Sequence, residues 1–329
     1  MPNPQRRRLL AALALAPWLP ARAQGTSASL PHAIPPPTGP KPPLLLWDAP
    51  GPARQSTADF GVEYLDRNAP ENSLRDRLVR HVESPCLYPF PASRPNGLAA
   101  LIIPGGGYKH VVIDKEGFET AAWLAQRGVN AYVLLYRLPA DGWVAGSRAP
   151  LEDAQRALQL VRARAAIDGH AAHRVFVQGF SAGGHLAAWL ATGGGDPASP
   201  RPDAAVLLYP VIKLAGPFAH AGSAQQLLGE SPSTDALSRH EPDRLVDPAT
   251  PPALLIHALD DTAVPPENSV AMMQALRNGG HRVESHFFEE GGHGFGLRFA
   301  VGKPVAAWPT LALEWVSRTL PAGVERNRP

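Results

Sequence analysis

Three residues far apart in the chain have the types and settings of a nucleophile, an acid and a base. The serine is Ser181, in the segment GFSAG (residues 179–183), directly after an apolar run and directly before a helical pattern. A G-x-S-x-G turn between a strand and a helix is typical of a nucleophilic serine, because the turn is too tight for side chains at the glycine positions. The motif alone is weak, and a glycine-rich connection with an incidental serine is the alternative. The prediction therefore requires partners elsewhere in the chain.

The segment LLIHALDDTAVP contains the candidate acid at the end of an apolar, strand-like run. A carboxylate at the carboxyl end of a parallel strand lies at the edge where ligands bind. We favour Asp261, and we expect Asp260 to be a turn residue. The candidate base is His293 in EEGGHGFG, on a glycine-rich loop after the last predicted strand. The chain order Ser181, Asp261, His293 is a known nucleophile–acid–base order of serine hydrolases with an open α/β sheet.

The chain has twelve histidines, so most of them need another role. We expect His185, four residues after Ser181, to pack or to line the site, His257 to be a core residue inside a strand, and His110 to border the pocket. No H-E-x-x-H pattern occurs, so no metal and no other cofactor is expected. Cys86 is the only cysteine, which excludes an intrachain disulfide, and it is predicted to be a buried apolar residue rather than a nucleophile.

The segment IIPGGGYKH predicts donors for a negative oxygen. Gly105, Gly106 and Gly107 follow an apolar run directly, and with the amide of Ala182 they are candidates for an oxyanion hole. The sequence does not decide which glycine amide points inward, and a simple turn is the alternative. Phosphate-binding loops are excluded because no G-K-[ST] follows and the spacing is not G-x-G-x-x-G.

Apolar runs alternate with helical patterns along the chain. Nearly continuous apolar stretches predict buried parallel strands, and spacings of three and four predict the helices. Two earlier runs, 43–47 and 82–90, are interrupted by prolines and are predicted to be antiparallel edge strands. We expect an α/β fold, a mostly parallel central sheet of about eight strands with helices on both faces in three layers. The predicted parallel strands are 98–104, 130–138, 173–180, 204–212, 252–259 and 282–290, and the helices are 116–128, 151–166, 266–280 and 309–320.

Composition and length favour one catalytic domain over residues 43–320. Of the 329 residues, 44% are hydrophobic, which allows a large core. The net charge is +2 and the body of the chain has no basic run, which argues against a nucleic-acid partner. Residues 213–250 break the alternation and predict a small insertion over the carboxyl edge of the sheet, with a short helix near 225–228. Residues 24–42 are a proline-rich lead-in, and residues 321–329 form a tail.

The first 23 residues have the pattern of a secretory signal peptide. A positive start precedes a short apolar centre and the small-residue site Ala21-Arg22-Ala23. The apolar centre is too short to span a bilayer. Arg6 and Arg7 also resemble a twin-arginine export signal, with an ordinary export signal as the alternative. We expect a periplasmic or secreted protein with no membrane anchor after cleavage.

Beyond these single motifs, the chain resembles the acetyl-xylan-esterase-like branch of the α/β-hydrolases over roughly residues 43–319. The resemblance is carried by PGGGY, GFSAGGHLA, YPVI, HAGSAQQLLGESP, PATPPALLIHALDDTAVPPENS and EEGGHGFG. It implies the α/β-hydrolase fold and a serine esterase that removes acetyl, or sometimes feruloyl, groups from plant polysaccharides and related small esters. It also implies the same three catalytic residues and an oxyanion loop at residues 105–107. Related esterases often begin that loop with His-Gly-Gly-Gly, where this chain has Pro104.

An exported sugar esterase would need a wall that fits sugar rings. The candidates for that wall are Tyr108, His110, Trp143 and His185, because aromatic faces suit sugar rings, and ordinary core packing is the alternative for the two aromatic residues. Rival functions are a prolyl-oligopeptidase-like serine peptidase, a broad small-ester esterase and a non-catalytic binding protein on a hydrolase scaffold. The first usually carries a large extra domain, and the last would lack a member of the triad.

Overall fold

A computed structural model describes residues 39–49, 51–55, 61–67 and 74–323. The predicted signal peptide lies outside these residues, as do most of the proline-rich lead-in and of the tail. The described residues fall in one compact unit of the chain. Within the described ranges, each helix is too short or too polar to cross a membrane.

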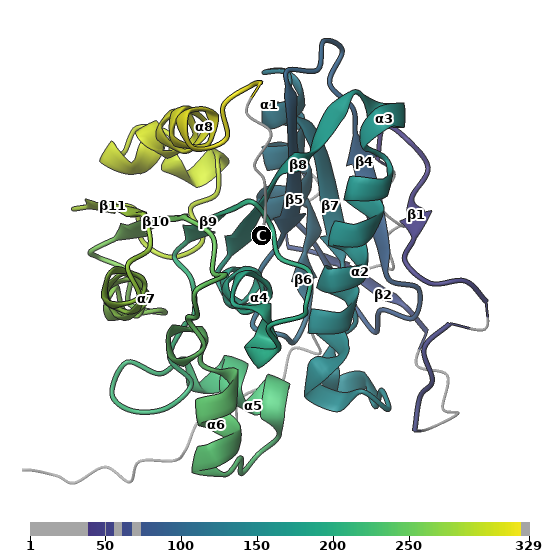
Figure 1. Ribbon diagram of the computed structural model, residues 1–329. Helices are drawn as coiled ribbons and strands as arrows, with labels where there is room; N and C mark the ends of the chain where they lie inside the picture. Colours follow the sequence, from purple (N-terminus) through teal and green to yellow (C-terminus); the bar gives the residue numbers. More distant parts are fainter. Residues whose placement is uncertain (1–38, 50, 56–60, 68–73, 324–329) are drawn as a thin grey trace, which may run out of the picture. The chain divides into compact units, whose positions relative to one another are not determined.

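The centre of the fold is an eight-stranded sheet with the order β1-β4-β7-β5-β8-β9-β10-β11 (Figure 1). In this spatial order, each neighbouring pair in the run β7-β5-β8-β9-β10-β11 is parallel. Strand β4 is antiparallel to both of its neighbours, β1 and β7. This is the predicted mostly parallel α/β sheet. The strands are β1 (Leu44–Leu45), β4 (Cys86–Phe90), β5 (Gly97–Ile103), β7 (Asn130–Leu135), β8 (His170–Phe180), β9 (Ala204–Leu208), β10 (Ala253–Ala258) and β11 (Val283–Phe288).

The apolar runs form the central strands because both faces of the sheet are covered. Every residue of β7, β9 and β10 is buried, which explains why their sequences do not alternate between apolar and polar residues. The proline in β4 is tolerated for a different reason. Strand β1 pairs only with Cys86 and Leu87, so Pro89 lies where β4 is itself the edge and no hydrogen bond from its nitrogen is required.

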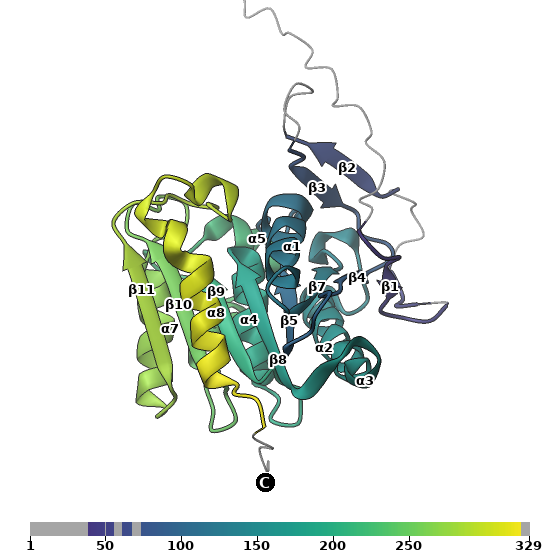
Figure 2. The same cartoon turned by 90° about the horizontal axis from the view of Figure 1, so that it is seen from above.

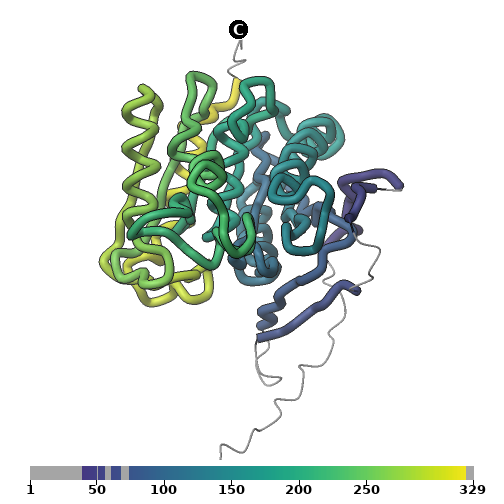
Figure 3. The backbone as a smooth tube through the Cα atoms, turned by 90° about the horizontal axis from the view of Figure 1, so that it is seen from below, coloured from purple at the N-terminus to yellow at the C-terminus, as the bar shows by residue number. Residues whose placement is uncertain are grey.

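Helices cover the sheet in two layers. Figures 1 and 2 show α1 and α8 on one face and α2, α4 and α7 on the other, so the three-layer prediction is confirmed. Figure 3 shows the backbone as a tube, with purple and blue N-terminal segments on one side of the molecule and green to yellow C-terminal segments on the other. The helices are α1 (Glu119–Ala125), α2 (Ala149–Ala163), α3 (Ala165–Asp168), α4 (Ala182–Ala191), α5 (Ala221–Leu228), α6 (Thr234–His240), α7 (Glu267–Asn278) and α8 (Trp308–Thr319).

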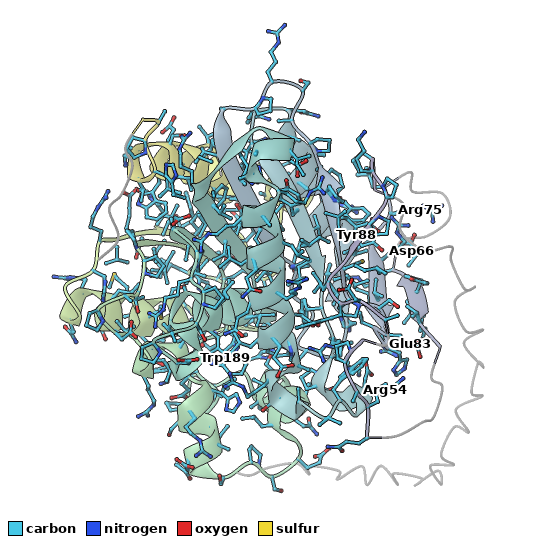
Figure 4. The ribbon with its side chains drawn as sticks, turned by 45° about the vertical axis from the view of Figure 1, so that its right-hand side comes forward. Arg54, Asp66, Arg75, Glu83, Tyr88 and Trp189 are labelled. Carbon is cyan, nitrogen blue, oxygen red and sulfur yellow. The ribbon has the colours of Figure 1, made fainter. Side chains whose placement is uncertain are left out.

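A small antiparallel sheet beside the main one was not predicted. It consists of β2 (Glu63–Asp66), β3 (Arg77–Arg80) and β6 (Val111–Val112), in the order β2-β3-β6 (Figure 2). Strands β2 and β3 have four residues each with a charged residue at both ends, and β6 has only two residues, so none of them contains a long apolar run. Ion pairs help to hold this part of the chain: Arg75 pairs with Asp66, and Arg54 pairs with Glu83 at 3.3 Å (Figure 4).

The segment 213–250 contains two helices, α5 and α6, where the sequence predicted one short helix. Glu241 is almost fully buried and holds the segment together, because its carboxylate accepts hydrogen bonds from Lys213 and from the amides of Leu214 and Ala215. The ring of His240 packs against Trp189 of α4, with centroids 4.9 Å apart (Trp189 is labelled in Figure 4). The segment is therefore fastened to the helix that follows Ser181.

Candidate active site

Ser181 lies on a tight turn between β8 and α4, as its motif predicted. Its φ of 52° and ψ of −120° are rare for a residue with a side chain, and such strain is concentrated at functional sites. Gly183, in the first turn of α4, has no room for a side chain. A Cβ there would overlap the carbonyl oxygens of Ile103 and Pro104 at the end of β5. The glycine thus allows the serine turn to lie directly against the glycine loop.

The fold brings the three predicted residues into one hydrogen-bonded chain. The Oγ atom of Ser181 lies 2.9 Å from Nε2 of His293, and Nδ1 of His293 lies 2.7 Å from Oδ2 of Asp261. Because the carboxylate accepts from Nδ1–H, Nε2 of the neutral ring is the acceptor for the serine hydroxyl. The side chain of Asp261 is fully buried, and that of His293 is 26% exposed. A base within reach of a serine hydroxyl, oriented by a carboxylate, is the arrangement that activates a serine.

Asp261 is held as an ionised carboxylate. Burial opposes its ionisation, but hydrogen bonds from His257 and His293 outweigh burial and lower the pKa of Asp261 below its ordinary value. Its Oδ1 atom also accepts the amides of Ala263 and Val264, at 3.0 and 2.9 Å. His257 is fully buried inside β10, as predicted, and its Nε2 atom lies 3.2 Å from Oδ2 of Asp261.

Asp260 has a role that the sequence analysis assigned differently. It was expected to be the turn residue, yet Asp261 makes the local turn bonds. The carboxylate of Asp260 instead accepts the amides of Gly291 and Gly292, at 2.9 and 2.7 Å, across 31 and 32 residues of chain. These bonds fasten the loop that carries His293 to the end of β10.

The glycine loop is held by its carbonyl groups and by one of its amides. The Pro104 carbonyl accepts the Tyr136 hydroxyl at 3.0 Å, and the Gly105 amide donates to Oε2 of Glu116 at 2.7 Å. The carbonyls of Gly105 and Gly106 accept backbone amides from residues 109–112. Within the described chain, the amides of Gly106, Gly107 and Ala182 have no protein partner. These three are the donors that remain open to a ligand, and the Gly105 amide is not among them.

Three of the four residues predicted for a sugar-binding wall are not accessible. Tyr108 and His185 are fully buried and Trp143 is 3% exposed, so a substrate does not reach them in this conformation. Trp143 packs near the guanidinium groups of Arg54 and Arg137. His110 is partly exposed, and burial lowers its pKa to about 4. The aromatic types indicated a sugar platform, but the tertiary structure uses these side chains as packing.

His185 joins the glycine loop to the helix after Ser181. Its Nε2–H donates to the His240 carbonyl at 2.7 Å, so its Nδ1 atom is free to accept the Tyr108 hydroxyl, also at 2.7 Å. Burial lowers the pKa of His185 to about 4, although the bond to the His240 carbonyl acts in the opposite direction. His185 is therefore a neutral packing residue, which is one of its two predicted roles.

The sequence analysis missed several residues around the site. Tyr209, at the end of β9, packs edge-on against the ring of His293 with centroids 5.0 Å apart. Its hydroxyl donates to Oε1 of Glu116 at 3.1 Å. His220 of the insertion is near enough for the charges of His293 and Asp261 to affect its pKa, which burial lowers. Tyr209 and His220 begin the segments YPVI and HAGSAQQLLGESP, but the sequence assigned neither residue a role, because only its position in space reveals its contacts.

In the part of the chain that the structure describes, no three or more His, Cys, Asp or Glu side chains form a group that could hold a metal ion.

Comparisons with known proteins identify relatives of this chain. An acetylxylan esterase of Xylanibacter ruminicola is 33% identical over 213 residues, which is 63% of this chain and 43% of that protein. The endo-1,4-beta-xylanase B of Butyrivibrio fibrisolvens is 35% identical over 206 residues, or 59% of this chain and 32% of that protein. The chain thus spans less than half the length of these two curated relatives.

A solved structure covers more of the chain. The acetyl ester-xyloside bifunctional hydrolase of Caldicellulosiruptor lactoaceticus has a TM-score of 0.66 and 33% identity, covering 89% of this chain and 98% of that one. The carboxylesterase Cest-2923 of Lactobacillus plantarum has a TM-score of 0.60 and 25% identity, covering 80% of this chain and all of that one. The BD-FAE family model matches residues 90–276. This protein therefore belongs to the BD-FAE family of α/β-hydrolases, as the resemblance predicted.

Proposed function

We propose that this protein is a serine-dependent carboxylic ester hydrolase that acts through an acyl-enzyme. The observation that carries the proposal is the hydrogen-bonded chain from Ser181 through His293 to the buried carboxylate of Asp261. The names of its relatives, an acetylxylan esterase and a carboxylesterase, support the same class of reaction.

The geometry supports a two-step mechanism. His293 removes the proton from the Ser181 hydroxyl as Oγ attacks the ester carbonyl, and Asp261 orients the ring and stabilises the imidazolium. The amide of Ala182 and those of Gly106 and Gly107 are the open donors for the oxyanion of the tetrahedral intermediate. His293 then gives the proton to the departing alcohol, and water repeats the cycle to release the acid and free serine.

We propose acetyl esters of plant polysaccharides or oligosaccharides as substrates. The names of two relatives that act on xylan or its esters support this choice. A broad small-ester esterase is the second candidate, supported by the carboxylesterase among the structural relatives. The N-terminal pattern leads us to propose export to the periplasm or the medium, and N-terminal sequencing of protein recovered from the periplasm tests cleavage after Ala23.

Acetate release from acetylated xylan, pectin, xylo-oligosaccharides and p-nitrophenyl acetate tests the proposal. We expect Ser181→Ala to lower kcat/KM by roughly 10⁴-fold or more, because the nucleophile is lost while binding is retained. A fluorophosphonate should label the native protein at Ser181 and leave the variant unlabelled. Normal turnover by Ser181→Ala would overturn the assignment, and faster cleavage of a prolyl peptide amide than of any ester would indicate a peptidase.

The neighbouring pair Asp261 and Asp260 gives a matched test of the acid. We expect Asp261→Asn to lower kcat about 10⁴-fold, because the amide favours the wrong tautomer of His293. Asp260→Ala keeps the charge on Asp261 and removes the Oδ1 acceptor of two loop amides, so we expect a loss of about tenfold. Steady-state kinetics on p-nitrophenyl acetate decides between them, and equal losses would mean that the two carboxylates share the role.

A further inference from the structure

We infer that Glu116 is a positioning residue that fixes the glycine loop so that its open amides face the oxyanion. The inference rests on the proposed ester hydrolysis and goes beyond the triad and its oxyanion donors. Glu116 lies in a π-helical turn (Ile113–Phe118) after the loop and is 3% exposed. Among the described residues, no Lys or Arg side chain forms an ion pair with it. Its carboxylate is instead occupied by two uncharged donors.

The first donor determines the orientation of a peptide group in the loop. The Gly105 amide donates to Oε2 of Glu116 at 2.7 Å, and the carbonyl of the same peptide, that of Pro104, accepts the Tyr136 hydroxyl at 3.0 Å. With both ends held, this peptide does not flip. The following carbonyl, of Gly105, accepts the Val112 amide at 3.0 Å, which leaves the Gly106 amide on the opposite side and without a protein partner.

The second donor links Glu116 to the loop of the base. The Tyr209 hydroxyl donates to Oε1 of Glu116 at 3.1 Å, and the oxygen of that hydroxyl accepts the Gly296 amide at 3.3 Å. Burial and the neighbouring carboxylate raise the pKa of Tyr209, so its hydroxyl stays protonated and donates. The Tyr209 ring packs on His293. One buried carboxylate thus orients the glycine loop directly and the histidine loop through Tyr209.

The chemistry of this site requires a carboxylate. Two buried donors converge on Glu116, so the residue must present two acceptors. Glutamine has the same shape but only one acceptor, and its NH₂ group would face either the Gly105 amide or the Tyr209 hydroxyl. A buried donor without an acceptor is costly, so the loop would shift to find one. An error of about 1 Å in the position of an oxyanion donor is enough to lower the rate about 100-fold.

The test compares Glu116→Gln with the native protein on p-nitrophenyl acetate, with thermal unfolding measured in parallel. We expect kcat to fall roughly 10- to 100-fold while KM changes by less than about threefold, because the oxyanion exists only in the transition state. Fluorophosphonate labelling of Ser181 should persist at a reduced rate, which separates this effect from loss of the nucleophile. Glu119→Gln, a nearby acid whose carboxylate pairs with Arg298, is the matched control and should keep native kcat.

A second variant makes the result specific. Tyr209→Phe removes one of the two donors, so a single acceptor at residue 116 is then enough for Gly105. We expect Glu116→Gln combined with Tyr209→Phe to be at least about threefold more active than Glu116→Gln alone, corresponding to one recovered hydrogen bond.

Two results would overturn the inference. One is a Glu116→Gln protein that melts at lower temperature but retains native kcat when folded, because the residue would then serve stability alone. The other is strictly additive losses in the double variant. If Glu116→Gln does not fold, Tyr209→Phe is tested alone. This variant keeps the ring against His293 but loses the hydroxyl that donates to Glu116, so we expect kcat to fall about 3- to 10-fold. Native kcat in Tyr209→Phe would refute the link between Glu116 and the histidine loop. Failure of Ser181→Ala to lose activity would instead refute the proposed function itself.

Discussion

The turn that carries Ser181 and the glycine loop meet at the same edge of the sheet, but they are held in different ways. Main-chain bonds hold the serine turn: the Ser181 amide donates to the Leu208 carbonyl at 3.1 Å, and its carbonyl accepts the Val211 amide at 3.0 Å. The glycine loop has main-chain bonds as well, but side chains also hold it, namely those of Glu116 and Tyr136 on its backbone, with His185 on the neighbouring Tyr108. Both turns leave a glycine motif in the sequence, whereas the side chains that hold the glycine loop are not part of its motif.

Within this comparison, the largest expected effect comes from adding a side chain at Gly183, where the serine turn lies directly against the glycine loop. Gly183→Ala would push a methyl group into the carbonyls of Ile103 and Pro104, which are backbone atoms that cannot rotate away. We expect a loss of about 3 kcal/mol in the free energy of unfolding and about 100-fold in kcat. Urea unfolding and p-nitrophenyl acetate kinetics measure the two quantities.

Gly107→Ala is the matched variant in the glycine loop. Nothing lies within 4 Å of a Cβ at this position, so only its φ of +64° opposes a side chain. We expect a cost of about 1 kcal/mol in the free energy of unfolding and kcat within about threefold of native, because the amide is retained. Equal damage from both variants would show that the serine turn is no more tightly constrained than the loop.

The next prediction concerns how the free energy of unfolding depends on pH through His185, which accepts a hydrogen bond from the Tyr108 hydroxyl. The pKa of His185 is lowered to about 4 in the folded protein, against about 6.5 in the unfolded chain, so unfolding binds a proton between these values. The free energy of unfolding should therefore fall as pH drops from 6.5 towards 4, with His185 contributing about 2 to 3 kcal/mol.

His185→Gln isolates this contribution, because glutamine can still accept from Tyr108 and donate to the His240 carbonyl. Denaturant unfolding at pH 7.5 and 4.5 should show a smaller difference between the two pH values for the variant than for the native protein. An unchanged difference would assign the pH dependence to other buried histidines, such as His170 and His240, whose pKa values are also lowered by burial.

Tyr136→Phe, like Gly107→Ala, has a small expected effect. It removes only the hydroxyl that donates to the Pro104 carbonyl, and Glu116 still holds the amide of the same peptide. We expect about 1 kcal/mol less stability and about a threefold loss of kcat. A loss as large as that of Glu116→Gln would mean that the carbonyl, rather than the amide, fixes the loop.

Features that depend on neighbouring residues were predictable from the sequence, whereas features that depend on contacts between distant residues were not. The structure has the predicted strand-to-helix turn at Ser181 and the predicted parallel strands, since a tight turn and an apolar run both leave a pattern in neighbouring residues. The small sheet of β2, β3 and β6 was missed because all three strands are short and β2 and β3 have charged residues at both ends. The sequence analysis offered an accessible sugar-binding wall that included Tyr108, Trp143 and His185, which are buried in the structure. The residue type alone does not show whether an aromatic side chain packs in the core or faces a sugar.

The sequence by itself determined the order of strands and helices and the chemical types at the site, because burial periodicity and tight turns act on neighbouring residues. Only the tertiary structure decided that Asp260 fastens the loop of His293, that the Gly105 amide is already occupied, and that Glu116 and Tyr209 connect two loops. Those outcomes depend on contacts between residues up to 93 positions apart, and no spacing along the chain records which donor reaches which acceptor.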